Sequence, residues 1–280
     1  MTPVRQVLPI ASRRCQTHPM NRTGAPHRRS KALPTIAACL LALTGCGLGS
    51  STSDLDALQA SAPTEGPSCH PTPDPARRQF VIGYGSLMQE QSRTQTAPRA
   101  TGSRPVDLTG FRRGFFTQGA MPGFNTVFLG VVPDAQSRIN AVVFEVPAVE
   151  IPALDIREYV YCRVLVPPGA LSMLDGGDAV AGQTWIYVNI RSSLGLASDT
   201  VPLVQSYVDI FLSGCLEMEQ RFALEGFADR CITTTSDWSE HWVNDRLFPR
   251  RPMATFPQAK AVDSLLSRRL PEQFAAIRIE

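Results

Sequence analysis

The sequence is short of metal-ligating residues. Its 280 residues include four histidines, and two of them, His70 and His241, lie beyond residue 45. None of the seven cysteines has a partner at Cys-x-x-Cys spacing. A zinc site needs three or four clustered cysteine, histidine or carboxylate ligands. The sequence therefore predicts no zinc site.

Acidic residues are absent from the first 31 positions, which carry seven basic ones. The whole chain has 27 basic and 25 acidic residues, so the part after residue 31 has 20 basic and 25 acidic residues and a formal charge of −5. Proteins that bind nucleic acid by its phosphates present a basic surface. A mildly acidic body argues against nucleic acid as a partner.

The basic stretch precedes a mostly apolar run at residues 32–43. This run is too short to span a bilayer and suits the apolar region of a signal peptide. It ends in Leu-Thr-Gly-Cys at residues 43–46, which resembles the lipobox of bacterial lipoproteins. We predict that residues 1–45 are a lipoprotein-type signal peptide. An Arg-rich transit peptide and a disordered basic tail are the alternatives.

This interpretation makes Cys46 the lipidated first residue of an exported protein, anchored to the membrane on its periplasmic or cell-surface side. Residues 46–78 are rich in serine, threonine, proline and glycine, and we expect a disordered tether there. The tether and the body contain four more cysteines, Cys69, Cys162, Cys215 and Cys231. Outside the cytoplasm these four either form two disulfides or stay buried thiols. We predict a bond between Cys215 and Cys231, since both lie in a helical region.

Strand and turn signals alternate from residue 79 onward. β-branched and aromatic segments predict strands near residues 79–83, 105–118, 125–132, 138–146, 159–166 and 183–190. A short helix is predicted at 148–156, where Pro152 moves its start to Ile151. Glu158 then falls at the exit of this helix. The pattern favours an α+β fold, a small and mostly antiparallel β-barrel with a few helices.

The pattern becomes helical after Arg191. Apolar residues at helical spacing predict helices from Thr200, near residues 222–227, from Ser236 with Trp238 and Trp242 on one face, and over 257–269. We assign residues 79–191 to the β-rich domain and residues 192–280 to a helical extension packed on it.

One strand, Phe-Val-Ile at residues 80–82, breaks into Gly-Tyr-Gly-Ser-Leu-Met at residues 83–88. A strand that enters such a turn can aim several backbone N–H groups at one anion; a tight structural turn is the alternative. The stretch lacks the Gly-Lys-Ser/Thr of a P-loop and the third glycine of a dinucleotide fingerprint. It is not a Gly-x-Ser-x-Gly nucleophile elbow either.

Three segments follow one another in order: residues 83–88, Asn-Ala-Val-Val-Phe-Glu-Val at 140–146, and Leu-Asp-Ile-Arg-Glu-Tyr at 154–159. Together they resemble the gamma-glutamylcyclotransferase-like family, over roughly residues 79–191. Gly-Phe-Arg-Arg-Gly-Phe at residues 110–115 is similar to another segment of that family. With the lipobox, the resemblance implies a bacterial, lipoprotein-type member.

The resemblance implies an intramolecular reaction. The free α-amine of a γ-glutamyl group attacks its own γ-carbonyl, 5-oxoproline forms, and an amine or peptide leaves. Such a reaction mainly requires that the substrate be folded into a reactive shape. One carboxylate can take the proton of the amine and later pass it to the leaving nitrogen. We therefore expect a small-molecule γ-glutamyl substrate, glutathione among the candidates, and no metal or organic cofactor.

The resemblance also assigns residues. Glu158 matches the catalytic glutamate of the family, with a solvated surface charge as the alternative. Tyr84, Gly85, Ser86 and Leu87 match the loop that holds the substrate carboxylate or the γ-carbonyl oxygen by its backbone N–H groups.

Two further residues are weaker candidates. Arg112 is a candidate partner for a substrate carboxylate, with a structural salt bridge as the alternative. Asp155 is the second candidate for the catalytic role, although we expect it to cap or brace the helix exit instead. A non-catalytic binding or scaffolding lipoprotein with the same fold and anion pocket is the alternative function.

Overall fold

The computed structural model describes residues 51–66, 68–121, 124–251 and 258–280. These residues belong to one compact unit, residues 48–280. The predicted signal peptide, residues 1–45, and the predicted lipidation site Cys46 lie outside the described residues. Within the described part, no helix is both long and apolar enough to cross a membrane.

The chain alternates between strands and short helices before it becomes mainly helical. The strands are β1 (Gln79–Gly83), β2 (Thr101–Met121), β3 (Phe124–Val146), β4 (Tyr161–Leu165), β5 (Leu171–Met173), β6 (Gln183–Asn189), β7 (Leu203–Val204), β8 (Thr235–Ser236), β9 (Trp242–Asn244) and β10 (Arg278–Ile279). The α-helices are α1 (Ser51–Ser61), α2 (Glu90–Thr94), α3 (Ile151–Arg157), α4 (Gln205–Phe222), α5 (Phe227–Thr233), α6 (Ala259–Arg269) and α7 (Pro271–Ala276). Three 3-10 turns complete the set, η1 (Ser86–Met88), η2 (Ala148–Glu150) and η3 (Arg191–Ser193).

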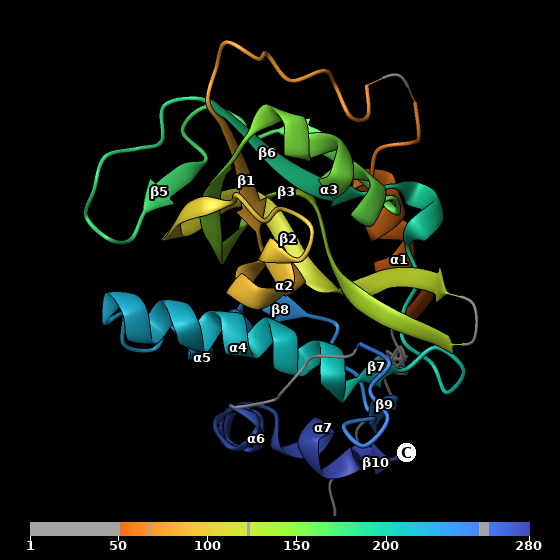
Figure 1. Ribbon diagram of the computed structural model, residues 1–280. Coiled ribbons are helices and arrows are strands. Elements are labelled where there is room, and N and C mark those ends of the chain that lie inside the picture. Colours follow the sequence, from red (N-terminus) through yellow and green to blue (C-terminus); the bar gives the residue numbers. More distant parts are fainter. Residues whose placement is uncertain (1–50, 67, 122–123, 252–257) are drawn as a thin grey trace, which may run out of the picture. The chain divides into compact units, whose positions relative to one another are not determined.

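The main sheet has the strand order β4-β6-β1-β3-β2-β5, with β8 added to β2 (Figure 1). Its neighbours pair antiparallel except for β1 with β6 and β2 with β8. This confirms the predicted α+β class. The described strands form an open sheet, because β4 and β5, at the two ends of this order, do not pair with each other. The predicted closed barrel is therefore replaced by an open, mostly antiparallel sheet.

Two predicted strands, residues 125–132 and 138–146, are one continuous strand, β3. Pro133, expected to end the first of them, lies inside β3 opposite Phe111. The pairing shifts register here, between Thr109 and Phe111, and Gly110 adopts a positive φ of 89°. A bulge of this kind tolerates a proline within a strand. β1 pairs only with residues 142–146 of β3, so the missing N–H of Pro133 breaks no bond to β1.

The order of the strands brings two distant segments to one edge. β1 runs parallel to β6, with Val81 beside Trp185, whereas β4 runs antiparallel, with Tyr161 beside Asn189. The end of β1 and the start of β4 therefore both lie at the carboxyl end of β6. The segment after Gly83 and the segment before Tyr161 meet at this edge.

The sheet buries apolar side chains on both faces. Along β1 and β3 successive residues alternate between two clusters, as expected for strands. Val81 and Phe144 belong to one cluster, whereas Ile82 and Val143 belong to the other. The first cluster also includes apolar residues of α4, so α4 covers that face.

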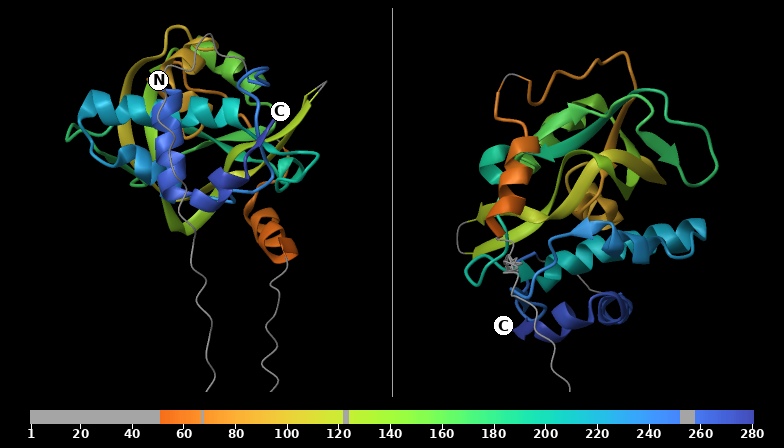
Figure 2. Two further views of the ribbon diagram at one scale, coloured as in Figure 1. Left: turned by 90° about the horizontal axis from the view of Figure 1, so that it is seen from below. Right: turned by 180° about the vertical axis from the view of Figure 1, so that it is seen from behind.

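Helix α4 lies between the sheet and α6 (Figures 1 and 2). Gly214 lets α4 approach the chain after β1, because a Cβ at this position would come within 2.5 Å of the Gln89 nitrogen. Predictions of helices near residue 200 and over 257–269 match α4 and α6, although α4 begins at Gln205.

The helix predicted from Ser236 is wrong. Asp237 has a positive φ of 60°, and Trp242 starts β9, which pairs with β7 and β10. Trp238 and Trp242 nevertheless stack, with ring centroids 5.5 Å apart.

The prediction of a disordered tether at 46–78 is also wrong for its described residues. Leu58 of helix α1, and Ala62 just after the helix, are buried against Phe116 and Val132. Cys69 is bonded to Cys162 of β4. One well-placed leucine and one disulfide thus order a segment whose composition is poor in large apolar residues.

Candidate active site

A pocket of about 150 Å³ opens where the segment after β1 meets the segment before β4. The chain has five tyrosines in all, and every one of them lines this pocket. The other lining residues include the predicted loop and the predicted catalytic glutamate. The full lining is Ile82, Tyr84, Gly85, Ser86, Leu87, Gly119, Phe128, Leu129, Arg157, Glu158, Tyr159, Val160, Tyr161, Tyr187, Tyr207 and Arg251.

The two glycines of the loop are required by close packing. A Cβ on Gly83 would lie 2.9 Å from the carbonyl carbon and oxygen of Leu87. A Cβ on Gly85 would lie 2.9 Å from the Tyr207 hydroxyl oxygen. Any larger residue at Gly85 therefore displaces Tyr207 from the pocket wall.

Arg157, the last residue of α3, ties the loop to Glu158. Its Nη2 donates to Ser86 Oγ over 3.0 Å, and its Nε lies 3.1 Å from Oε1 of the Glu158 carboxylate. The remaining donors go to the Ser92 carbonyl and hydroxyl and to Thr96 Oγ1. All five N–H groups of this guanidinium are thus engaged.

Glu158 caps the carboxyl end of α3, where its N–H donates to the Leu154 carbonyl. Its side chain is 14% exposed. Burial raises the pKa of Glu158 above its ordinary value, while Arg157 and Arg251 oppose the rise. A carboxylate whose pKa is raised toward neutrality is better matched to taking and returning a proton.

The buried tyrosines around Glu158 are held neutral. Burial raises the pKa of Tyr84, Tyr161, Tyr187 and Tyr207 above the ordinary value for a phenol. Three of their hydroxyls donate within the protein: Tyr84 to the Tyr187 carbonyl, Tyr161 to the Leu129 carbonyl, and Tyr187 to Asp155. These phenols therefore shape the pocket and are poor bases, and Glu158 is the acidic residue of the lining.

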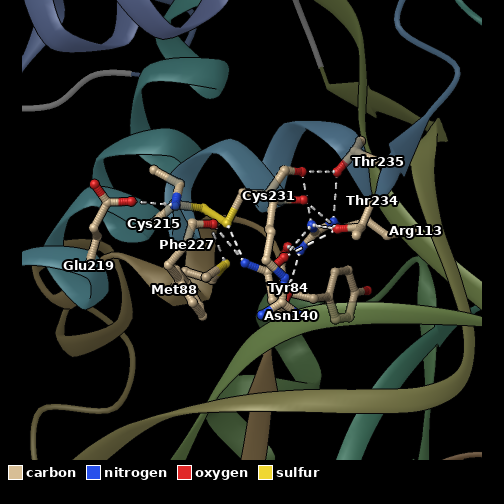
Figure 3. The surroundings of a disulfide bond; sticks show 12 residues. Tyr84, Met88, Arg113, Asn140, Cys215, Glu219, Phe227, Cys231, Thr234 and Thr235 are labelled. Atoms are coloured by element: carbon tan, nitrogen blue, oxygen red, sulfur yellow. Dashed lines mark hydrogen bonds between the residues drawn. A yellow bond between two sulfur atoms is a disulfide. The ribbon is translucent and has the colours of Figure 1, made fainter. Parts of the chain in front are cut away.

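The buried side chain of Arg113 supports the start of the loop at Tyr84 (Figure 3). Arg113 is fully buried and donates to the Tyr84 carbonyl and to the carbonyl and side chain of Asn140. It also donates to the Cys231 carbonyl and to the hydroxyls of Thr234 and Thr235. Burial lowers its pKa to about 9.

The predicted disulfide between Cys215 and Cys231 is present and joins α4 to α5 (Figure 3). Cys215 Sγ lies 3.8 Å from Met88 Sδ, at the end of η1. The disulfide and Arg113 thus brace the two ends of the loop that starts at Tyr84.

Arg112 and Asp155 lie outside the pocket lining. Arg112 pairs with Asp237 at 3.0 Å and donates to Ser236 Oγ. Asp155 accepts from Arg163 and from the Tyr187 hydroxyl. Burial alone would raise the pKa of Asp155, but Arg163 and Tyr187 hold it below the ordinary value. Asp155 therefore ties α3 to Arg163 of β4 and to Tyr187 of β6, and Tyr187 lines the pocket.

Several polar residues of the pocket, among them Arg157, Tyr207 and Arg251, were not predicted as site residues from the sequence. Arg157 adjoins Glu158 in the chain, and that proximity was the available signal. Tyr207 and Arg251 come from the C-terminal region, and no local pattern marks them. Among the described residues, no group of three or more histidine, cysteine or acidic residues is arranged to hold a metal ion.

The protein thus has an α+β fold and a pocket in which the partly buried carboxylate of Glu158 lies beside the glycine-containing loop after β1. Residues 81–201 match the family model described as gamma-glutamyl cyclotransferase, AIG2-like. This match confirms, for that segment, the family resemblance seen in the sequence. It supports a cyclotransferase-like function. No curated protein matches the chain.

Several solved structures are similar to part of the chain. A gamma-glutamyl cyclotransferase is 13% identical, over 55% of this chain and 86% of its own, with a TM-score of 0.43. A yeast gamma-glutamyl cyclotransferase specific to glutathione is 13% identical, over 56% and 95%, with a TM-score of 0.37. The Arabidopsis thaliana protein At5g39720.1 is 22% identical, over 44% and 74%, with a TM-score of 0.32.

Proposed function

We propose that this protein is a cofactor-independent gamma-glutamylcyclotransferase that releases 5-oxoproline from a γ-glutamyl amine or peptide. The α-amine nitrogen attacks the γ-carbonyl carbon of the same glutamyl group. A new C–N bond closes the five-membered lactam, and the bond from that carbon to the leaving nitrogen breaks. The proton that the amine loses is transferred to the leaving nitrogen.

The observation that carries this proposal is the position of Glu158. Its carboxylate lies in the same small pocket as the loop of Tyr84, Gly85, Ser86 and Leu87. An α-amine with a pKa of about 8 is mostly protonated at neutral pH and must lose a proton before it attacks. Glu158 is the proposed acceptor, and it returns the proton to the leaving nitrogen.

The loop has the complementary role. The γ-carbonyl oxygen gains negative charge as the amine attacks, and fixed backbone N–H groups stabilise such charge. Ser86 is held by Arg157 at 3.0 Å, so the loop is supported before substrate binds. A pocket of this small size favours a folded substrate, in which the amine already faces the carbonyl.

The chemistry restricts the substrate. The α-amine must be free, so γ-glutamyl amines and peptides, glutathione among them, qualify. Peptidoglycan γ-glutamyl bonds do not, because the α-amine there is normally acylated.

The test is to incubate the purified full chain with a panel of γ-glutamyl amines and peptides and to measure 5-oxoproline. We expect turnover of at least one compound, and none of its N-acetylated counterpart. If no compound is turned over while one is bound, the protein is a binding module with the same fold.

The cellular location is a separate proposal. We propose that Cys46 is lipidated and that the mature protein starts there, outside the cytoplasm. The sequence from Leu43 to Cys46 supports this, and so do two disulfides, which persist in oxidising compartments. Labelling cells with a fatty-acid analogue tests it, and equal labelling of a Cys46→Ala variant contradicts it.

A further inference from the structure

Two polar residues of the pocket lie beyond the family-matched segment, which ends at residue 201. Tyr207 comes from the first turn of α4, and Arg251 follows β9. The pocket is therefore completed by the C-terminal region.

The backbone at Arg251 is held in place by buried side chains. Its N–H donates to Ser206 Oγ over 3.1 Å, and the N–H of Arg250 donates to Asp245 Oδ2 over 2.7 Å. Asp245 also accepts from the hydroxyl of Ser206 over 2.7 Å. Ser206 and Asp245 are 0% and 1% exposed. The start of the Arg251 side chain is thus fixed to α4.

The Arg251 guanidinium lies against the pocket wall, with its central carbon 5.4 Å from the centre of the Phe128 ring. It is close enough to Glu158 to lower the pKa of that carboxyl. Within the described residues, its side chain has no hydrogen-bond or ion-pair partner. Arg157, the other cation of the lining, has every donor engaged. Arg251 is therefore the lining cation whose donors are available to a bound molecule.

We infer that Arg251 binds a carboxylate of the substrate and so restricts the pocket to anionic γ-glutamyl compounds. A guanidinium matches a carboxylate with two parallel N–H groups. This inference rests on the proposed function. The carboxylate is either the α-carboxylate of the glutamyl group or a carboxylate of the leaving group, and the test separates these two sources.

The experiment compares KM and kcat of Arg251→Met with the wild type on γ-glutamylglycine. Loss of hydrogen bonds to a charged group raises KM roughly 10- to 100-fold, with kcat little changed. Arg251→Lys keeps the charge and restores part of the loss. Arg268→Met is the matched control, because its exposed side chain pairs with Asp229 outside the pocket. Its KM stays at the wild-type value.

Two further substrates locate the carboxylate. With γ-glutamylethylamide, which has no leaving-group carboxylate, an unchanged penalty for Arg251→Met indicates the α-carboxylate, and no penalty indicates the leaving group. The α-amide of γ-glutamylglycine gives the reverse pattern. A penalty that is equal on all three compounds, or absent from all, overturns the inference.

Calorimetry separates failure of the inference from failure of the proposed function. γ-Glutamylglycine is titrated into Glu158→Gln with and without Arg251→Met. If the double variant binds more weakly than Glu158→Gln and the wild type shows no turnover, the carboxylate site is supported and the proposed enzymatic function is contradicted. If the wild type shows turnover and Arg251→Met leaves KM unchanged, the proposed function is supported and the carboxylate site is contradicted. An absence of both binding and turnover overturns both.

Discussion

The guanidinium of Arg157 lies beside the carboxylate of Glu158, with Nε 3.1 Å from Oε1. The same guanidinium holds Ser86 and Ser92 by hydrogen bonds. One side chain therefore fixes the distance between the proposed proton acceptor and the loop that is proposed to hold the substrate. It also opposes the effect of burial on the pKa of Glu158.

Replacing Arg157 by methionine should move the acidic limb of the pH–rate profile to higher pH. Burial already raises the pKa of Glu158, and removal of the opposing Arg157 charge raises it further. The fraction of Glu158 that is ionised near neutrality falls, so kcat/KM at that pH falls. The measurement is kcat/KM between pH 5 and pH 9.

Arg99→Met is the control for that profile. Arg99 pairs with Glu150 and its side chain is 61% exposed, and it does not line the pocket. We expect its profile to match the wild type. An acidic limb that stays in place in Arg157→Met contradicts the role given to this arginine.

Gly85→Ala should weaken substrate binding, and removal of the Tyr207 hydroxyl oxygen should restore part of that binding. The new Cβ would lie 2.9 Å from the Tyr207 hydroxyl oxygen, which accepts from the Leu129 N–H. Tyr207→Phe removes that oxygen, so the double variant should bind more tightly than Gly85→Ala alone. Binding is measured by calorimetry with a substrate identified in the panel.

Gly83→Ala is the matched case that Tyr207→Phe should not rescue. There the Cβ would meet the backbone of Leu87 at 2.9 Å, and a backbone group cannot be removed. Equal rescue of both glycine variants would show that the contact with Tyr207 is irrelevant.

Arg113→Met should destabilise the fold by about 3–5 kcal/mol, because each buried acceptor that is left unsatisfied costs about 1–3 kcal/mol. The variant removes six hydrogen bonds that the guanidinium donates, among them the bond to the buried Tyr84 carbonyl. Urea unfolding measures the free energy. Arg112→Met is the control: its partly exposed pair with Asp237 should contribute about 1 kcal/mol or less. Equal losses in the two variants would contradict this account.

Much of the site was predictable because it is carried by local patterns. The strand at residues 79–83 and the glycines after it mark the loop, and the short helix before Tyr161 places Glu158 at its exit. What joins them is the order β4-β6-β1, which no local pattern contains. The family resemblance supplied that link from the sequence.

The C-terminal region was less predictable because long-range pairing overrides its local spacing. Trp238 and Trp242 are four residues apart, as on one face of a helix, but they stack from a segment whose ends pair with β2 and with β7. Arg251 is unpredictable for the same reason, because its backbone is placed by long-range hydrogen bonds, from its own N–H to Ser206 and from the Arg250 N–H to Asp245. Leu58 shows the converse, since one buried leucine anchors a segment that is otherwise polar.

Glu158→Gln should stabilise the protein at pH 7. Burial raises the pKa of Glu158 in the folded state, so the folded protein binds this proton more tightly than the unfolded chain does. The protonated Glu158 therefore contributes to the free energy of unfolding. This contribution is complete below the pKa of the unfolded chain, about 4.3, and is lost as pH rises through the pKa of Glu158 in the folded protein. Glutamine stays neutral, so its advantage should grow from pH 4 to pH 7. Thermal unfolding across this range measures it.

Asp175→Asn is a control of opposite sign. The hydrogen bond from Arg104 lowers the pKa of Asp175, so its ionised form stabilises the fold above the unfolded pKa. This variant should lose stability at pH 7 and approach the wild type in acid. A Glu158→Gln protein that behaves in the same way would mean that Glu158 is a stabilising ion-pair partner.

The most direct test of the central claim is the rate of 5-oxoproline release by Glu158→Gln on the best substrate of the panel. Glutamine keeps the size of the side chain and removes the proton acceptor. A positioned acid–base group contributes roughly 10²- to 10⁴-fold to a rate. We predict a fall of that size in kcat, with circular dichroism and calorimetry showing an intact fold and retained substrate binding. A folded Glu158→Gln protein that releases 5-oxoproline at nearly the wild-type rate would contradict the account.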